Sequence, residues 1–168
     1  LDTRGAFAKV IGRAKEAFSQ LLGGEPQRTI RGANGLDVRL RNRTYRSEAA
    51  QVRHMVMENT ASGGASLHRL KAECLPLVEN TVVNADVVLD GPQGTPEEGR
   101  GYYIKRYEGP GGQAIDHVIV TTPQGELDGQ YLITQFPTGR RRQGNRRIEW
   151  ERAEPRPGVS GTDRAGRT

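Results

Sequence analysis

Hydrophobic residues in the first half of the chain recur at three- and four-residue spacing, which is typical of amphipathic helices. Residues 7–22 form the longest such pattern, and the pair Gly23-Gly24 directly after it is a helix stop. A second pattern covers residues 47–59 and opens on a serine, a residue that caps helix N-termini. A third begins at Ser66 and is short, because Pro76 disfavours helical geometry in the residue before it. We therefore expect three helices.

From Val82 onwards the pattern changes to the two-residue alternation of β-strands. The spacers between the apolar runs are rich in glycine, proline and charge, as hairpin connections are. The expected strands are residues 82–83, 86–89, 102–104, 115–122, 131–136 and 147–153, with one short earlier strand at 36–40. Helices followed by strands predict an α+β fold, in which N-terminal helices pack on a meandering antiparallel β-sheet.

A chain of 168 residues is expected to hold one main domain with extensions. We expect residues 1–45 to form an N-terminal helix and a basic loop, and residues 46–153 to form the α+β domain. Residues 154–168 have almost nothing to bury and are predicted to be a disordered tail. The formal net charge of +5 favours RNA as a partner, because phosphate neutralisation releases counterions. The alternative is that this charge serves solubility only.

Several signatures are missing from the sequence. Cys74 is the only cysteine, so the chain by itself forms no disulfide and no thiolate metal cluster. The sequence contains no apolar run of membrane-spanning length, no phosphate-binding nucleotide loop and no metalloprotease motif. Acidic residues do not gather with a histidine at metal-ligand spacing. We therefore expect no cofactor, no metal and no membrane span.

Histidine can both take and give a proton near neutral pH, which makes the three histidines the first catalytic candidates. His54 and His68 fall on the second and third expected helices. His68 shares a helix face with Lys71 one turn later, so an imidazole and an ammonium point the same way and suit a phosphate. The alternatives are a solvated polar face for His68 and a simple pair with Glu58 for His54.

Two further candidates lie on the expected strands. His117 follows the alternation of its strand, and it is either catalytic or a structural histidine bonded to backbone. Thr134 alternates with Leu132 and Phe136, so its hydroxyl is expected to project from an otherwise apolar row. Threonine is also common in strands for structural reasons alone, and this alternative stays open.

The strongest phosphate-binding signal is the segment 140–147, which holds five arginines and no acidic residue. Guanidinium groups are always charged and pair bidentately with phosphate. The alternative is a solvated loop or a sheet edge protected by charge. Tyrosines interleaved with cations earlier in the chain suit base stacking, or an ordinary sheet surface. The expected substrate-binding residues are Arg140, Arg141, Arg142, Tyr103 and Lys105.

These groups suit metal-independent cleavage of RNA, because the 2′-hydroxyl can attack the adjacent phosphorus once a base removes its proton. The order of elements also resembles a known group. Amphipathic helices precede Leu75-Pro76-Leu77-Val78-Glu79-Asn80, and the late strands read His-Val-Ile-Val and Leu-Ile-Thr-Gln-Phe-Pro-Thr. Over residues 46–153 this resembles the barnase, EndoU, colicin and RelE-like ribonuclease superfamily, especially its phage-borne and polymorphic-toxin branches.

The resemblance implies a compact ribonuclease toxin, often carried at the end of a delivery protein and neutralised by an immunity partner. We expect that partner to be acidic, transfer RNA to be a target, and the domain to be a secreted or delivered effector acting in the target-cell cytoplasm. Matched residue by residue, the resemblance nominates His68 or His54 from the helices and His117 and Thr134 from the strands, with Lys71 and the Arg140 cluster as supporting cations. The alternatives are an ADP-ribosyltransferase toxin and a non-catalytic RNA-binding module.

Overall fold

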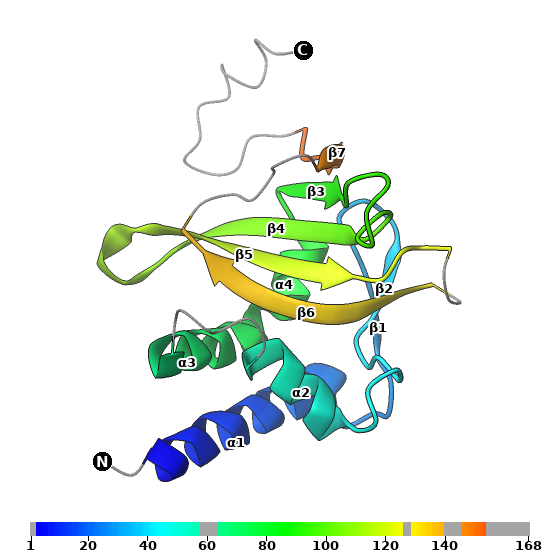
Figure 1. Cartoon of the computed structure of the whole chain (residues 1–168). Coiled ribbons are helices and arrows are strands. Elements are labelled where there is room, and N and C mark those ends of the chain that lie inside the picture. Colours follow the sequence, from blue (N-terminus) through cyan, green and yellow to red (C-terminus); the bar gives the residue numbers. More distant parts are fainter. Residues whose placement is uncertain (1–2, 58–63, 126–128, 140–145, 154–168) are drawn as a thin grey trace.

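A layer of helices covers one face of a curled β-sheet in the computed structural model, which describes residues 3–57, 64–125, 129–139 and 146–153 (Figure 1). The expected α+β class is confirmed. In chain order the elements are α1 (Thr3–Leu22), β1 (Thr29–Arg31), β2 (Asp37–Arg39), α2 (Glu48–Met57), α3 (Gly64–Cys74), the 3-10 turn η1 (Leu75–Leu77), α4 (Val78–Val83), β3 (Val87–Asp90), β4 (Gly101–Glu108), the 3-10 turn η2 (Pro110–Gly112), β5 (Ala114–Thr121), β6 (Gln130–Thr138) and β7 (Arg147–Glu151).

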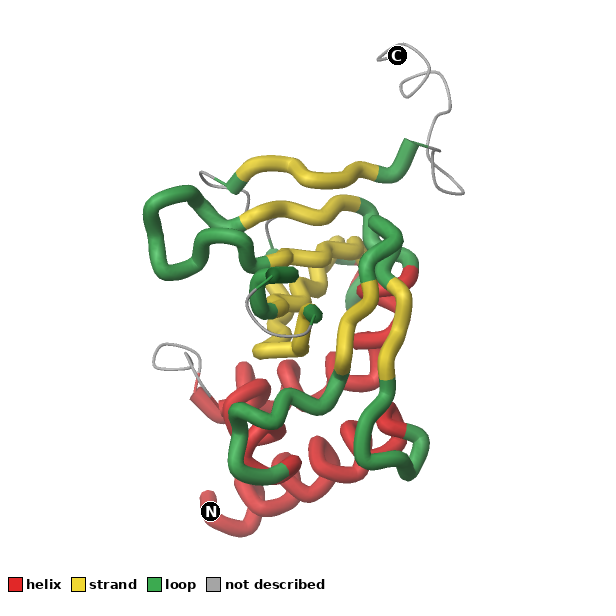
Figure 2. Tube along the Cα trace, turned by 90° about the vertical axis from the view of Figure 1, so that its right-hand side faces the viewer, coloured by secondary structure: helices red, strands yellow, loops and turns green. Residues whose placement is uncertain are grey.

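The sheet has seven strands in the order β1-β2-β6-β5-β4-β3-β7. Strands β3 to β6 form the expected antiparallel meander, and β7 returns to pair antiparallel with β3. Strand β2 pairs with β6 in parallel, so the sheet as a whole is mixed rather than purely antiparallel. Figure 2 shows the short strands β1 and β2 side by side at one end of the sheet.

Residues on both sides of the expected boundary at 45/46 share one core. Phe18 of α1 and Val38 of β2 pack in the same buried cluster as Met55 of α2 and Ile119 of β5. The N-terminal segment is therefore part of the α+β unit and supplies two of its strands. The expected tail, residues 154–168, lies outside the described residues.

The expected strand at Val82–Val83 is wrong, because these residues are the end of helix α4. Val78, Thr81 and Val82 are the buried residues of α4, and their spacing of three and four places them on one helix face. A pair of β-branched residues suggested a strand, but burial against the core determines the conformation here.

The end of α1 and the start of α2 lie where the glycine pair and the serine cap in the sequence predict them. Gly23 and Gly24 adopt φ angles of 65° and 78°, which residues with side chains rarely adopt, and α1 ends there. The Ser47 hydroxyl accepts a hydrogen bond from the Ala50 N–H at 3.1 Å and caps α2. No helix in the described part of the chain has both the length and the apolarity to cross a bilayer.

Candidate functional site

A buried histidine lies between the sheet and the helix layer. His117 of β5 is 1% exposed, and both of its ring nitrogens are engaged. Its Nε2 lies 2.7 Å from Oε1 of Gln135 on β6, and its Nδ1 lies 2.7 Å from the hydroxyl of Thr81 on α4. His117 therefore joins α4, β5 and β6.

The partners of Gln135 determine which nitrogen of His117 carries the proton. The Gln135 Nε2 group donates to the carbonyl oxygens of Met55 at 3.2 Å and Lys71 at 3.0 Å, so its Oε1 is the acceptor. His117 must then donate from Nε2 and accept from the Thr81 hydroxyl at Nδ1. Burial lowers the pKa of His117 to about 4, against the opposing effect of the Gln135 hydrogen bond. His117 is thus neutral and has no lone pair left for a substrate.

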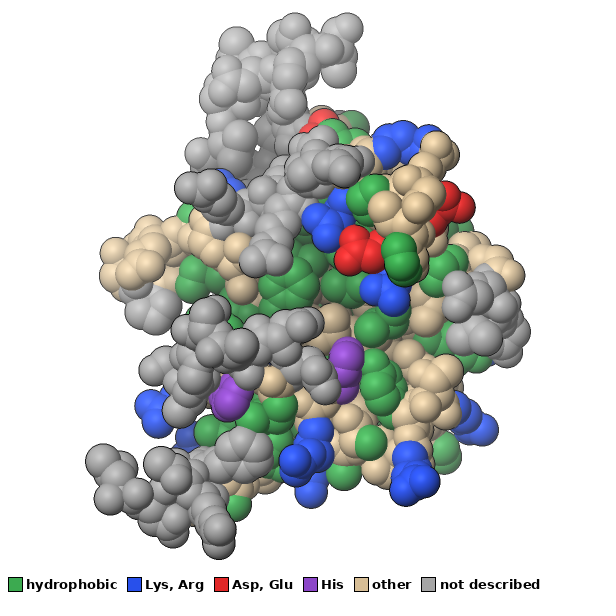
Figure 3. Space-filling view, viewed as in Figure 1, with side chains coloured by type: hydrophobic (Ala, Val, Ile, Leu, Met, Phe, Trp, Pro, Cys, Tyr) green, Lys and Arg blue, Asp and Glu red, His purple; other side chains and the backbone are tan. Residues whose placement is uncertain are grey.

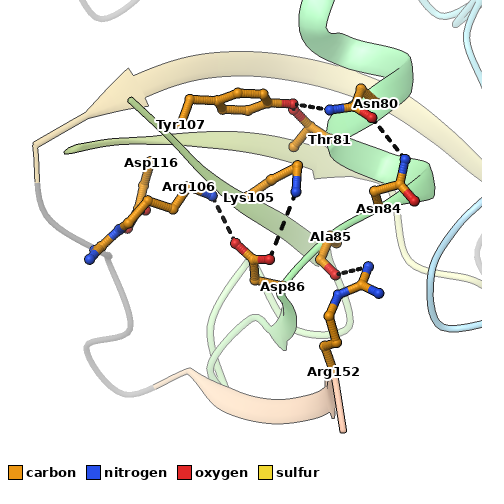
Figure 4. Close-up of polar contacts among 10 residues, drawn as sticks. All are labelled: Asn80, Thr81, Asn84, Ala85, Asp86, Lys105, Arg106, Tyr107, Asp116 and Arg152. Atoms are coloured by element: carbon orange, nitrogen blue, oxygen red, sulfur yellow. Dashed lines mark hydrogen bonds and ion pairs between the residues drawn. The ribbon is translucent and has the colours of Figure 1, made fainter. Parts of the chain in front are cut away.

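The hydrogen bonds continue from Thr81 to exposed residues at the surface of the protein (Figure 4). Since the Thr81 proton is used by His117, the Tyr107 hydroxyl donates to Thr81 at 2.9 Å and accepts from Asn80 Nδ2 at 2.9 Å. Asn80 in turn accepts from Asn84 at 2.8 Å. Burial raises the pKa of Tyr107, and the hydrogen bonds with Thr81 and Asn80 oppose this effect. We call Asn84, Asn80, Tyr107, Thr81, His117 and Gln135 the His117 network.

Charged residues beside the network are paired with one another. Asp86 accepts a hydrogen bond from the Arg106 N–H at 2.8 Å, and the Lys105 ammonium lies 4.0 Å from its other oxygen (Figure 4). Lys105 also lies over the Tyr107 ring, 5.8 Å from its centroid. The Arg106 side chain pairs with Asp116 at 2.9 Å. Lys105, expected to bind substrate, thus balances a buried carboxylate on the helix side of the sheet.

The two remaining histidines lie on helices that Gln135 holds together. One amide nitrogen bonds the carbonyls of Met55, next to His54, and of Lys71, one turn after His68. The C-terminal turns of α2 and α3 therefore converge on one point of β6. Both imidazoles are partly exposed, and Figure 3 shows histidine side chains at the surface over the helix layer.

His54 and Lys71 differ in their access to solvent. The His54 ring lies 5.1 Å from the ring of Tyr45, whose hydroxyl contacts the Ile133 carbonyl of β6 at 3.4 Å. The His54 ring therefore lies beside a tyrosine that itself contacts β6. Lys71 is 5% exposed, so its ammonium is not positioned to meet a phosphate from solvent. Glu58, the alternative partner of His54, lies outside the described residues.

Thr134 lies apart from the other candidate catalytic residues. It pairs with Val120 and therefore lies on the face of the sheet that points away from the helices, opposite to His117. A register shift after Val120 pairs Thr121 with Leu132, which breaks the alternation expected for this strand. The Thr134 hydroxyl and the imidazoles are thus on different sides of the sheet.

The expected base-stacking role of Tyr103 is not supported, because its ring is 0% exposed. Its hydroxyl donates to Gln130 at 2.7 Å, and burial raises its pKa. Arg140, Arg141 and Arg142 lie outside the described residues. The next arginine, Arg146, stacks on Tyr102 at 4.1 Å from the ring centroid and lies 3.6 Å from Glu97.

Sequence reasoning missed two residues that organise this region, Gln135 and Thr81, and it considered Tyr107 only as one of the tyrosines that suit base stacking or an ordinary sheet surface. Gln135 lies in a strand, where a lone amide suggests a solvent-facing position, yet it is fully buried. The signal present was the alternation of β6, which places Gln135 on the face opposite to Thr134. The position of Thr81 on a buried helix face was not predicted, because its segment was expected to be extended rather than helical.

Comparisons of the chain with protein-family models, with curated proteins and with solved structures found no match. The described residues contain no group of three or more His, Cys, Asp or Glu side chains that could hold a metal ion.

Proposed function

We propose that this chain is a ribonuclease toxin domain that cleaves RNA without a metal, with His54 and His68 as its acid–base pair. The observation that carries the proposal is the double hydrogen bond from Gln135 to the helix turns beside these two residues. These two bonds support the proposal that the partly exposed imidazoles of His54 and His68 lie on a common surface. Histidine is the side chain best suited to exchange protons at neutral pH.

The proposed reaction transfers two protons, forms a bond between the 2′-oxygen and phosphorus, and breaks the bond between phosphorus and the 5′-oxygen. One imidazole takes the proton of the 2′-hydroxyl as its oxygen attacks phosphorus, and the other, protonated, gives a proton to the leaving 5′-oxygen. The products are a 2′,3′-cyclic phosphate and a free 5′-hydroxyl. His117 and Gln135 are positioning residues in this scheme, because they touch the helices and not the substrate.

Two features of the whole chain support RNA as the substrate. The formal charge of +5 favours a polyanion. The order of helices followed by an antiparallel meander agrees with the barnase, EndoU, colicin and RelE-like superfamily that the sequence resembles. An acidic immunity protein is the corresponding proposed partner, because opposite net charges favour association.

Incubation of the purified chain with total RNA tests this function. We expect fragments that end in cyclic phosphate, formed equally with and without a chelator, and no cleavage of RNA whose 2′-hydroxyls are methylated. His54→Ala and His68→Ala should each reduce cleavage at least ~100-fold, the usual contribution of an acid or base. Glu73→Ala, an exposed change on α3, is the matched control. Retention of RNA without cleavage would instead favour a binding module, and modification that needs NAD would favour an ADP-ribosyltransferase.

A further inference from the structure

The connection between β2 and α2 is held in place by two buried amide side chains. Gln51 of α2 is 0% exposed, and its Oε1 accepts a hydrogen bond from the Asn42 N–H at 2.9 Å. The Asn42 side chain donates to the Leu132 carbonyl of β6 at 3.0 Å and accepts from the Thr44 N–H at 3.1 Å. We call residues 41–46 the 41–46 loop. Its buried and fully paired amides give it a fixed conformation before any ligand binds.

The 41–46 loop presents two arginines to solvent. Arg43 and Arg46 are exposed, and neither forms an ion pair in the part of the chain that the structure describes. Arginines on the strands instead pair with carboxylates, namely Arg31 with Asp37, Arg106 with Asp116 and Arg147 with Asp90. A guanidinium group without a carboxylate partner can offer its planar set of donors to a phosphate.

The surroundings of the helix layer also favour an anion. On the face of this layer that Figure 3 shows, Lys and Arg side chains of the described residues are visible and Asp or Glu side chains are not. The histidine side chains lie on the same face. A phosphate at this surface therefore meets cations without a competing carboxylate beside them.

Tyr45 connects the 41–46 loop to His54. The centroids of the two rings are 5.1 Å apart, and the Arg41 guanidinium donates to the Tyr45 carbonyl at 3.2 Å. Arg43 is two residues before Tyr45 in the chain, and Arg46 directly follows it. Both exposed guanidinium groups thus extend from backbone that is anchored beside a proposed catalytic imidazole.

We infer that the 41–46 loop binds the sugar-phosphate backbone of single-stranded RNA, with Arg43 and Arg46 on the phosphates next to the linkage cleaved at His54. This inference rests on the proposed function and deepens it, because it names the cations that hold the substrate against one of the two histidines. A backbone phosphate has two unesterified oxygens, which a guanidinium fork can bind together. Contacts of this kind position the strand but do not read its base sequence.

The salt dependence of RNA binding tests the inference without cleavage. The full chain is titrated into a labelled single strand whose 2′-hydroxyls are methylated, and fluorescence anisotropy is recorded from 50 to 200 mM salt. Each phosphate contact contributes about 0.7 to the slope of log affinity against log salt concentration. Arg43→Gln and Arg46→Gln should therefore each reduce that slope by about 0.7 and weaken binding roughly tenfold at 50 mM salt.

Arg31→Gln is the matched control. It removes the same charge from an exposed residue that is already paired with Asp37 at 3.3 Å. The loop follows Arg39, whereas Arg31 and Asp37 lie at the other end of the β1–β2 pair. This variant should keep the wild-type affinity and slope.

NMR signals of the histidine rings test the position of the bound strand. Addition of the methylated RNA should shift the ring signals of His54 in the wild-type chain. The ring of His117 is 1% exposed and serves as the internal reference, whose signals should stay in place. RNA binding that leaves the His54 signals unchanged would contradict the placement of the strand beside this residue.

Two further results would overturn the inference. One is an unchanged affinity and slope in both loop variants, and the other is an equal loss in Arg31→Gln, which would indicate a general effect of net charge. RNA binding that depends on Arg43 and Arg46 in a chain that does not cleave RNA would refute only the proposed function. Cleavage of RNA by a chain whose loop variants bind RNA as the wild type does would refute only the inference.

Discussion

His117 shows how much the environment of a residue decides its chemistry. As a histidine in a strand it was an obvious candidate for proton transfer, yet its two nitrogens are saturated by Thr81 and Gln135. Burial favours the neutral imidazole, which satisfies both partners by donating from Nε2 to Gln135 and accepting from Thr81 at Nδ1. The residue therefore connects α4 to β6 instead of reacting.

The buried state of His117 predicts a pH dependence of stability. The folded pKa of about 4 lies below the unfolded value near 6.5, so acidification protonates the unfolded chain first and favours unfolding. Stability from this group is complete above pH 6.5 and is lost as the pH falls toward 4. Between pH 7 and pH 5 the free energy of unfolding should fall by about 2 kcal/mol from this group alone, measured by urea denaturation.

The control for this prediction is His117→Gln, which lacks the titrating group and should lose less stability over the same pH range. Equal pH slopes for the two proteins would contradict the assignment. If the variant does not fold, NMR titration of the wild-type imidazole answers the same question, because His117 should still be neutral at pH 5.

Gly101 is a second position at which a single added side-chain atom is expected to lower the stability of the fold. A Cβ added there would lie 2.7 Å from the Thr121 hydroxyl and 3.2 Å from the Tyr103 ring, and both neighbours are fully buried. Gly101→Ala should destabilise the protein by about 1–3 kcal/mol through overpacking. Gly125→Ala is the matched control, because its Cβ would meet nothing within 4 Å. Equal thermal unfolding midpoints for the two variants would show that the strand relaxes without cost.

At the scale of elements, Gln135 connects both helix ends to the sheet. Gln135→Met keeps much of the side-chain volume but removes the bonds to Met55, Lys71 and His117, which leaves buried polar groups unpaired. We expect a loss of about 2–4 kcal/mol and faster amide hydrogen exchange at the C-terminal turns of α2 and α3. Gln20→Met, an exposed change on α1, should do neither. Unchanged exchange in α2 and α3 would contradict the role of Gln135.

The elements that the sequence predicts well are those with a strong local pattern. The end of α1, the cap of α2 and the strands around His117 follow from periodicity and glycine placement. Helix α4 and strand β1 were not predicted, because six and three residues are too few for a period to be recognised. The parallel pairing of β2 with β6 depends on contacts between residues about ninety positions apart, which local patterns do not contain.

The candidate site was harder to predict than the fold. Alternation placed His117 on a definite face of its strand, but pairing with Gln135 required the register of β5 and β6 and the position of two helices. The register shift after Val120 moved Leu132 out of the row of Thr134 and Phe136, and a shift of this kind has no signature in the residues themselves.

For the whole molecule, the cationic charge should govern RNA affinity. Binding by phosphate neutralisation weakens steeply with salt, so the affinity for single-stranded RNA should fall at least ~10-fold between 50 and 200 mM salt. Fluorescence anisotropy with a labelled, 2′-methylated strand measures this without cleavage. An affinity that does not change with salt would contradict an electrostatic interface and favour the view that the charge of +5 serves solubility.

The pH–rate profile of RNA cleavage tests the assignment of His54 and His68 most directly. With one imidazole as base and the other as acid, the wild-type profile should be bell-shaped around neutral pH. His54→Ala and His68→Ala should each lose a different limb of that bell, while Glu73→Ala keeps both. A profile that stays bell-shaped at full rate in both histidine variants would contradict the proposal that these two helices supply the catalytic pair.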